Sequence, residues 1–537
     1  MTAEAIRASF EAAEPVTAAV ALAAKNGKAM SPGGGGRPII QVRAGDLHVL
    51  ATEAEEALLN ARAPFFIRGG IVRPVVDEVA ASRGQSAKVA RLVSVDRDTI
   101  IDHLSRSADW IKWNVRKDGW VPTDPPAAVA STIMARDGEW GFLPLVGVIT
   151  TPTLRPDGTI LASPGYDPAT RLLLLDPPKL PPIPSKPTRA DALNALALLN
   201  GLLDEFPFVD EASRSAALSG LITPVVRGAM PVAPMHATTA PVPGSGKSYV
   251  IDLCSAIATG ERAPVISAGR TEEETEKRLG AALLAGQAII SIDNVNGELG
   301  GDALCQLIER PIVSVRPLGV SHLVKIESRA TCFATGNNIQ LVGDMTRRVV
   351  LCSLDPNVER PELRAFKARP MDAVTADRGR YVAAALIIAR AYAVAGYPGE
   401  LRPLASFEDW SRVVRSALVW LGRADPIDTM VKARAEDPVT TALGGLLETW
   451  HDAAGGSSRT AGAMVELAQT RDPLGNLVYS ALLEALREVA DDRRGGIDTR
   501  RLGKFLGRYN GRVVDGLKIA ASDDTHAKQR TWKVVRL

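Results

Sequence analysis

The sequence predicts an α/β fold class, with a central domain of alternating strands and helices and further domains on both sides. An extended segment at residues 235–240 leads into the Gly-rich stretch PVPGSGKS at 241–248 and then into an apolar run typical of a helix start. Two later apolar runs, 288–292 and 330–334, end in polar residues. Buried strands that end in polar groups beside a Gly-rich turn are typical of a phosphate-binding α/β domain.

Length and charge limit the possible organisation and partners. A chain of 537 residues is long enough for about three or four domains. Lys and Arg number 63 against 61 Asp and Glu, so the net charge is only +2. Any nucleic-acid binding must therefore come from local basic surfaces and not from the field of the whole protein.

Cysteine usage and hydropathy predict a reduced, cytoplasmic protein without a membrane partner. The cysteines lie in apolar runs without C-x-x-C spacing, which argues against disulfides and zinc: Cys254, Cys305, Cys332 and Cys352. No apolar run approaches the ~18 residues of a membrane span. Residues 16–24 resemble the core of a signal peptide, but three glutamates precede them where positive charge is expected.

Composition shifts along the chain predict seven segments. Residues 177–187 hold six prolines and predict a stiff linker, and the Ala-rich N-terminus ends in SPGGGGRP, which is typical of a tether. Helices are expected at 53–61, 99–113, from 188 and at 210–225. The predicted division is 1–38 flexible arm, 39–176 N-terminal α+β module, 177–187 linker, 188–230 helical collar, 231–376 ATPase core, 377–432 helical subdomain and 433–537 C-terminal domain.

The Gly-rich stretch fits a nucleoside triphosphate. Backbone N–H groups of such a turn and the helix behind it cradle phosphates, Lys247 would reach the β/γ-phosphates, and the Ser248 hydroxyl would complete a magnesium shell. Pro241 stands where the motif has its first glycine, and it is tolerable if φ is near −65°. The expected cofactors are ATP and Mg²⁺, and the expected cofactor-binding residues are Pro243, Gly244, Ser245, Gly246, Lys247, Ser248 and Tyr249.

Asp293 is the expected second magnesium ligand, because an apolar strand that ends in a carboxylate 46 residues after Lys247 is how such enzymes present it. Asn294 follows where a second carboxylate often activates the attacking water, and an amide cannot take a proton. Either Asp293 serves both roles or another carboxylate helps; Glu298 and the acidic run 272–274 are candidates.

The third strand, 330–335, ends in Gly336-Asn337-Asn338. The Asn337 amide would contact the γ-phosphate or hold the water. Ten residues later, Arg347 and Arg348 precede another apolar strand and could stabilise the transition state of phosphoryl transfer across a subunit boundary. Alternatively, the pair is a surface feature that binds Asp344 or solvent.

The order of these motifs across about 240–355 resembles the superfamily 3-type AAA+ helicases of phages, plasmids and integrative elements, which are often the helicase half of primase–helicase proteins. The resemblance implies an AAA+-type P-loop core, a homo-hexameric ring with ATP bound between subunits, and translocation on single-stranded DNA. It makes Asn337 the sensor-1 residue and leaves the arginine finger open between Arg347 and Arg348.

Apolar alternation on both sides of residues 317–321 predicts a β-hairpin. In the similar helicases a hairpin at this place grips the DNA backbone, so Arg316, His322 and Lys325 are the expected DNA contacts. The alternative is an exposed hairpin whose charges keep its edge soluble.

The C-terminal end is locally basic, with net charge +6 over residues 497–537. Arg501, Lys504 and Arg508 share one face of an expected helix, and two alternating strands follow, which predicts a winged-helix-like domain that binds DNA. A protein-docking module or a merely solvated face would give the same pattern.

Asp96 and Asp98 are the only carboxylate pair of the N-terminal module that suits a two-metal site. They lie at an expected helix start, where acidic residues act as caps. We therefore expect no primer synthesis by this chain alone, and a separate primase as partner.

These observations favour an ATP-dependent DNA helicase or replication protein of a mobile genetic element. The alternative is an ATP-controlled initiator, bound to origin duplex, or a helicase loader without unwinding activity of its own. An AAA+ ATPase that acts on protein is a third possibility, which the basic segments argue against.

Overall fold

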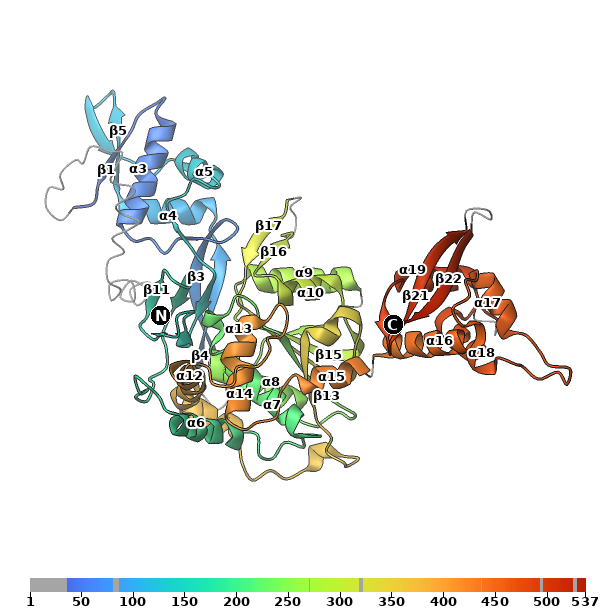
Figure 1. The fold of residues 1–537 in the computed structure, drawn as a ribbon. Helices are drawn as coiled ribbons and strands as arrows, with labels where there is room; N and C mark the ends of the chain where they lie inside the picture. Colours follow the sequence, from blue (N-terminus) through green and yellow to red (C-terminus); the bar gives the residue numbers. More distant parts are fainter. Residues whose placement is uncertain are drawn as a thin grey trace. The chain divides into compact units, whose positions relative to one another are not determined.

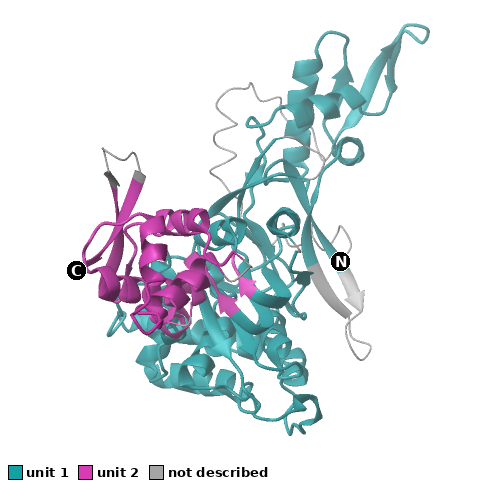
Figure 2. Cartoon of the chain, turned by 90° about the vertical axis from the view of Figure 1, so that its right-hand side faces the viewer, with its two compact units in different colours: residues 1–297, 301–339, 348–429 teal, residues 298–300, 340–347, 430–537 magenta. Residues whose placement is uncertain are grey.

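The computed structural model describes residues 36–80, 86–269, 271–317, 322–435, 437–492, 496–524 and 529–537. Most of the predicted flexible arm, 1–35, lies outside them. The chain forms two compact units (Figure 2). The first holds residues 1–297, 301–339 and 348–429, and the second holds 298–300, 340–347 and 430–537.

The first unit begins with a three-stranded sheet, in the order β1-β5-β6, and three helices that pack against it (Figure 1). Helix α4 ends at Ser107, so the expected helix at 99–113 is wrong in its second half. Ala108 is extended, and the alternating residues after it form β5, in which Trp110 pairs with Ile40 of β1. The elements are β1 Ile39–Val42, α3 Leu47–Asn60, α4 Arg97–Ser107, β5 Asp109–Asn114, β6 Gly119–Pro122 and α5 Ala127–Ala135.

Two sheets and a separate strand pair connect this part to the rest of the first unit. One sheet has the order β4-β3-β2-β7, another has the order β11-β12-β8, and β9 pairs with β10. Their bounds are β2 Phe66–Ile67, β3 Ile71–Ala80, β4 Ser86–Ser94, β7 Leu143–Pro144, β8 Gly147–Ile149, β9 Thr153–Leu154, β10 Ile160–Leu161, β11 Gly165–Asp167 and β12 Leu172–Leu174.

Side-chain caps determine where several helices begin. The Asp96 carboxylate accepts the Thr99 N–H at 2.8 Å, which confirms the expected cap at this position. Thr188 and Asp191 form a reciprocal capping box at the start of α6 (Arg189–Gly201), and Asp210 caps α7 (Glu211–Ile222). These two helices are those expected after the Pro-rich linker.

The largest sheet has the order β14-β15-β18-β13-β19. Strand β13 pairs in parallel with both neighbours, and β14 pairs in parallel with β15. The carboxyl ends of these strands therefore meet at one edge, where α/β proteins bind ligands. The elements are β13 Met235–Ala240, α8 Lys247–Thr259, β14 Val265–Ser267, α9 Glu272–Leu284, β15 Ile289–Leu299, α10 Asp302–Glu309, β18 Thr331–Leu341, η3 Gly343–Arg347 and β19 Val349–Ser353.

Helices after β19 complete the first unit. The Trp410 side chain is fully buried and donates its indole N–H to Thr223 Oγ1 at 3.0 Å. This bond ties the last helices of the unit to the end of α7. These elements are η4 Pro361–Leu363, α11 Pro370–Ala376, α12 Arg378–Val394, α13 Glu408–Trp410, η5 Ser411–Ser416 and α14 Ala417–Trp420, while the short η2 Arg227–Ala229 lies between α7 and β13.

The second unit packs helices against a three-stranded antiparallel sheet, β20-β21-β22. Its core includes Trp450, Leu486, Leu506 and Val534, each fully buried. The elements are α15 Asp428–Ala435, α16 Pro438–Ala454, α17 Ala461–Ala468, α18 Ser480–Ala490, α19 Thr499–Arg508, β20 Val513–Val514, β21 Leu517–Asp524 and β22 Gln529–Arg536. Among the described helices, none has the length and apolar character needed to cross a membrane.

A buried histidine makes the stability of the first unit depend on pH. His236 on β13 is 5% exposed, and its Nε2 lies 2.8 Å from Ser219 Oγ. Burial lowers the pKa of His236 to about 3. Between that value and the usual ~6.5 only the unfolded chain takes up a proton, so the free energy of unfolding falls as pH falls through this window.

We expect His236 to reduce the free energy of unfolding by about 2 kcal/mol between pH 7 and pH 5. Urea unfolding at the two pH values measures the loss. In His236→Gln this component should vanish, whereas the exposed His48→Gln should leave it intact. An equal pH dependence in wild type and His236→Gln would contradict the assignment.

Candidate functional site

The loop between β13 and α8 has a backbone that only glycine adopts easily. Gly244 and Gly246 have φ of 75° and 96°, which strains residues that carry a Cβ. A Cβ on Gly246 would also lie 3.2 Å from the Phe206 ring. The turn places the N-terminus of α8 at the carboxyl end of β13, which is an arrangement that binds phosphate.

Lys247 and Ser245 close this loop. The Lys247 ammonium donates to the Val242 carbonyl at 3.0 Å, and Ser245 Oγ donates to the same oxygen at 2.6 Å. Burial lowers the pKa of Lys247, and the charge of Asp293 opposes this effect. A phosphate anion here would further favour the charged ammonium form.

Asp293 connects three elements of the sheet edge. Its Oδ1 lies 3.4 Å from Ser248 Oγ of α8 and accepts a hydrogen bond from Thr335 Oγ1 of β18. A carboxylate and a hydroxyl at this spacing fit the oxygen ligands that Mg²⁺ prefers. Among the described residues no group of three or more His, Cys, Asp and Glu side chains could hold a metal by itself.

Asn337 lies between the phosphate loop and Asp293. Strand β18 separates β13 from β15, and Asn337 pairs with Ala240, the residue just before the loop. Its Oδ1 is buried and has no hydrogen-bond partner among the described residues. The Thr239 hydroxyl accepts the Ile339 N–H at 3.0 Å and fixes the neighbouring strand end. This is the place from which an amide can contact a γ-phosphate.

Asn294 adopts a left-handed backbone, with φ of 56°, and its side chain is exposed. Its N–H lies 3.3 Å from Thr335 Oγ1. Asparagine tolerates this conformation better than most residues. The left-handed backbone therefore explains why an asparagine suits this position, which the sequence pattern did not show.

The candidate carboxylates on α9 are engaged in local contacts. Glu272 Oε1 accepts the Asp302 N–H at 2.6 Å, Glu273 pairs with Lys277 at 2.8 Å, and Glu274 pairs with Arg278. These contacts favour a structural role for the acidic run 272–274. The other candidate carboxylate, Glu298, belongs to the second unit.

Two parts of the loop surroundings escaped the sequence analysis. The Phe206 ring packs 5.9 Å from the Tyr249 ring, and a Cβ on Gly244 would meet Glu362 at 3.3 Å. The Glu205 carboxylate accepts the N–H groups of Lys367 and Ala368, which holds the segment after β19 in place. The residues in these contacts are 43 or more positions apart and no sequence signal links them, so the contacts appear only in the fold.

The two candidate finger arginines differ in their surroundings. Arg348 is 4% exposed, and its guanidinium forms an ion pair with Glu309, which also accepts a hydrogen bond from Ser406. Arg347 belongs to the second unit, has a side chain that is 37% exposed, and lies 3.2 Å from the Asp344 carboxylate. Arg347 is therefore the one with a guanidinium accessible to solvent.

Strands β16 (Ile312–Val315) and β17 (Val324–Glu327) form the expected hairpin, with Ser314 opposite Lys325. Arg316, His322 and Lys325 are exposed, and residues 318–321 lie outside the described residues. The structure therefore confirms the hairpin and exposes all three candidate DNA contacts on it.

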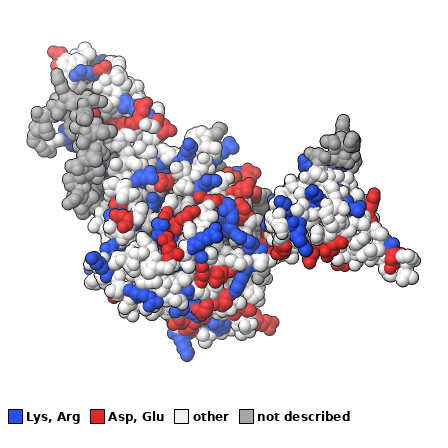
Figure 3. Space-filling model, viewed as in Figure 1, with Lys and Arg blue, Asp and Glu red and all other residues white. Residues whose placement is uncertain are grey.

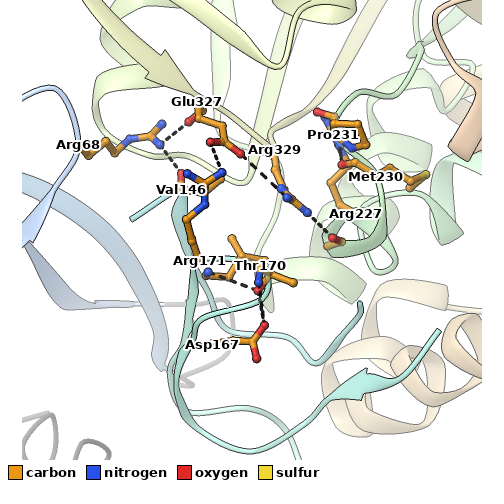
Figure 4. A network of polar contacts seen from close by, with 12 residues as sticks. Arg68, Val146, Asp167, Thr170, Arg171, Arg227, Met230, Pro231, Glu327 and Arg329 are labelled. Carbon is orange, nitrogen blue, oxygen red and sulfur yellow. Dashed lines mark hydrogen bonds and ion pairs between the residues drawn. The ribbon is translucent and has the colours of Figure 1, made fainter. Parts of the chain in front are cut away.

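Arg68 and Arg171 from distant segments, together with the nearby Arg329, fix the base of this hairpin at Glu327 (Figure 4). Arg171 pairs with the Glu327 carboxylate at 2.6 Å, Arg329 lies 4.0 Å from it, and Arg68 donates to the Glu327 carbonyl at 2.5 Å. Arg68 also donates to the carbonyls of Val146 and Leu283. Burial lowers the pKa of Arg68 to about 10, and Glu327 opposes this effect. The hairpin is thus attached to the N-terminal sheets as well as to the core.

The basic residues of α19 are exposed on the second unit. Arg501, Lys504 and Arg508 are all exposed, and Arg508 lies over the Tyr509 ring at 5.7 Å. On the face in Figure 3, basic and acidic side chains both occur, and the net charge of the whole chain is only +2. Any DNA contact must therefore be local.

No protein-family model and no curated protein matches this chain. Two solved structures of the NrS-1 C-terminal region are similar to it. One is 11% identical, with a TM-score of 0.36, and the match covers 90% of this chain and 100% of that chain. The other is 10% identical, with a TM-score of 0.34, and the match covers 84% of this chain and 94% of that chain. A JCV helicase with a bound acetamide compound has 14% identity and a TM-score of 0.19 over 46% of this chain and 68% of that one. TM-scores below 0.5 carry no argument, so the function is inferred from the site itself.

The Glu327 carboxylate should stabilise the hairpin base. In Glu327→Gln the charge partner of Arg171 and Arg329 is lost, and we expect the free energy of unfolding to fall by about 1–3 kcal/mol. Urea unfolding measures the change, and limited proteolysis reports the hairpin. The control Glu273→Gln removes a carboxylate that is 76% exposed and should change stability by less than about 0.5 kcal/mol. Equal effects of the two substitutions would contradict this role.

Proposed function

We propose that the chain is an ATP-dependent DNA helicase or replication protein of a mobile genetic element, with an AAA+-type core of the superfamily 3 kind. The observation that carries the proposal is the meeting of Lys247, Ser248, Asp293 and Asn337 at the carboxyl edge of one parallel sheet. These are the chemical groups that phosphoryl transfer needs: a phosphate cradle, a cation, oxygen ligands for magnesium and a polar group near the γ-phosphate.

Each residue has a role in ATP hydrolysis. Backbone N–H groups of the loop bind the phosphates, and Lys247 neutralises the β/γ-phosphates. Ser248 and Asp293 would hold Mg²⁺, which when bound neutralises charge that develops on the phosphates. Asn337 orients the γ-phosphate or the attacking water. The Asn294 amide can orient water but cannot accept its proton, so Asp293 is the carboxylate available for that step.

The assembly we propose is a homo-hexameric ring in which Arg347 acts on ATP bound by the neighbouring subunit. An arginine finger stabilises transition-state charge only if its guanidinium can reach the phosphate. Arg348 is committed to Glu309 in the interior, whereas Arg347 is partly exposed. This contrast favours Arg347 between the two candidates.

DNA would be held at two places. The hairpin with Arg316, His322 and Lys325 supplies cations for the backbone of a single strand, and its base is fixed at Glu327. The basic face of α19 and the strands β21–β22 would serve as a winged-helix-like module for DNA.

We expect the wild-type chain with ATP and Mg²⁺ to separate a forked duplex. Lys247→Ala and Asp293→Ala should each lower ATP hydrolysis and unwinding by about 100-fold or more, because each removes a group that acts on transition-state charge. Lys277→Ala alters an exposed lysine on α9 and should retain both activities. An assembled wild type that hydrolyses ATP without unwinding would contradict the helicase proposal.

Asn294 favours a second candidate function, an ATP-controlled initiator or loader, because slow hydrolysis suits a switch. The same ATPase assay with DNA added separates the two. Strong stimulation by single strands indicates a motor, and a preference for one duplex sequence indicates an initiator.

A mixing experiment tests the shared site. Arg347→Ala and Lys247→Ala should each be inactive alone, and mixing them should restore ATP hydrolysis, because mixed rings pair an intact Lys247 with an intact Arg347 from the neighbour. Arg106→Ala changes an arginine that is 67% exposed on α4 and should remain active. Mixtures that assemble but stay inactive would contradict the trans-acting role of Arg347.

A further inference from the structure

The sheet β1-β5-β6 has one face packed on helices and one face without a covering element among the described residues. Ile40 and Trp110 point into the core formed with α3, α4 and α5, and they are 2% and 4% exposed. Residues of opposite parity occupy the other face. Its members, in cross-strand register, are Ile39 with Asp109, Gln41 with Ile111, Ile111 with Pro122 and Trp113 with Trp120.

Two tryptophans lie side by side on this open face. Trp113 and Trp120 are direct cross-strand partners, with ring centroids 5.7 Å apart and planes at 79°. They are 48% and 39% exposed. The contact between the rings stabilises the β5–β6 hairpin. That contact still leaves a large part of both indole rings in water. Trp110, on the face covered by helices, is by contrast only 4% exposed.

Cations surround the tryptophan pair. Arg43 donates to the Gln41 side chain at 2.5 Å. It directly follows Val42, which pairs with Lys112, the residue before Trp113. Arg116 and Lys117 are exposed in the turn, where the Asn114 side chain accepts both of their backbone N–H groups. Asp109, the acidic residue of the face, is paired with Arg37 at 2.5 Å. Asp118 is exposed in the same turn as Arg116 and Lys117. Arg43, Arg116 and Lys117 outnumber it, so the segments next to the tryptophans keep an excess of positive charge.

We propose that this face binds single-stranded nucleic acid, with bases stacked on Trp113 and Trp120 and phosphates held by Arg43, Arg116 and Lys117. Every base has a π-face, so stacking on aromatic side chains is tolerant of sequence, and nearby cations track the backbone. Paired bases in a duplex have their faces covered by their neighbours and cannot stack on the indoles. The site is separate from the nucleotide site and from the β16–β17 hairpin.

The basic residues favour nucleic acid over an apolar peptide as the occupant, because a peptide would need no phosphate partners. Residues 1–35 of this chain are another possible occupant. They include Glu4, Glu11 and Glu14 and lie outside the described residues. Both alternatives are outcomes of the test.

The test measures binding of a fluorescein-labelled dT15 strand by the full chain without nucleotide, together with quenching of tryptophan emission. Wild type should bind and lose emission. Trp113→Ala with Trp120→Ala should weaken binding on the order of tenfold or more. Arg116→Gln with Lys117→Gln should make the affinity less dependent on salt, because fewer counterions are released. Unchanged affinity in the double alanine variant would overturn the proposal.

A second variant covers the possibility that the alanine substitutions unfold the hairpin. Trp113→Phe with Trp120→Phe keeps an aromatic surface, so binding should stay within a few-fold while most of the quenching disappears. The control Trp420→Phe alters a tryptophan covered by Arg189 and should leave the quenching intact. Quenching that survives in the double Phe variant would place the DNA elsewhere and overturn the proposal.

Two further outcomes would also overturn it. Duplex of the same sequence that competes equally with dT15 would exclude a single-strand site. A change in Trp113 and Trp120 emission on deletion of residues 1–35, without any DNA, would show that the chain's own N-terminus occupies the face. The readouts do not require ATP hydrolysis, so Lys247→Ala should bind dT15 like wild type. Failure here and failure of the helicase proposal are therefore distinguishable.

Discussion

Parallel pairing of the strands is the constraint on which the candidate site depends. Because β13, β15 and β18 run in the same direction, their carboxyl ends meet, and Asp293 can contact Ser248 and Thr335 at once. None of these contacts is local in sequence. A carboxylate has about four acceptor positions, and the two hydroxyl contacts leave capacity for a metal or a water. The hydroxyls thus orient Asp293 without exhausting it.

A second constraint is the attachment of the hairpin. Burying several arginines together is unfavourable. Burial lowers the pKa of Arg227, and the nearby charge of Arg329 adds to this effect, so that the pKa is about 9. Carbonyl oxygens and the Glu327 carboxylate compensate for the lost hydration of Arg68 and Arg329. Such a network is sensitive to the loss of one partner and tolerates little movement. The base of the hairpin is thus held both by the core and by the N-terminal sheets.

Local chemistry was predictable from the sequence, and long-range packing was not. Asp96 and the PVPGSGKS loop each carry their signal within a few residues, and the structure shows the cap and the strand–turn–helix there. The helix expected at 99–113 failed after Ser107, because pairing with β1 outweighed the apolar spacing. Glu309 beside Arg348 and Phe206 beside Gly246 had no sequence signal at all. The loop and its helix could be predicted because their signal is short, whereas the difference in burial between Arg347 and Arg348 needed the fold.

The burial of Arg348 distinguishes it from Arg347, its neighbour in the sequence. Arg348 is the charge partner of Glu309, whose side chain is only 18% exposed, and removal of one partner of such a largely buried pair is unfavourable by about 3–5 kcal/mol. Arg347 carries no such penalty, since its Asp344 partner is 68% exposed and surface pairs contribute little. Arg348 therefore anchors the strand that follows it, whereas the guanidinium of Arg347 stays accessible to solvent. Two arginines adjacent in the sequence thus differ in burial, with 4% of the Arg348 side chain and 37% of the Arg347 side chain exposed. The difference arises from which side of the chain faces the core.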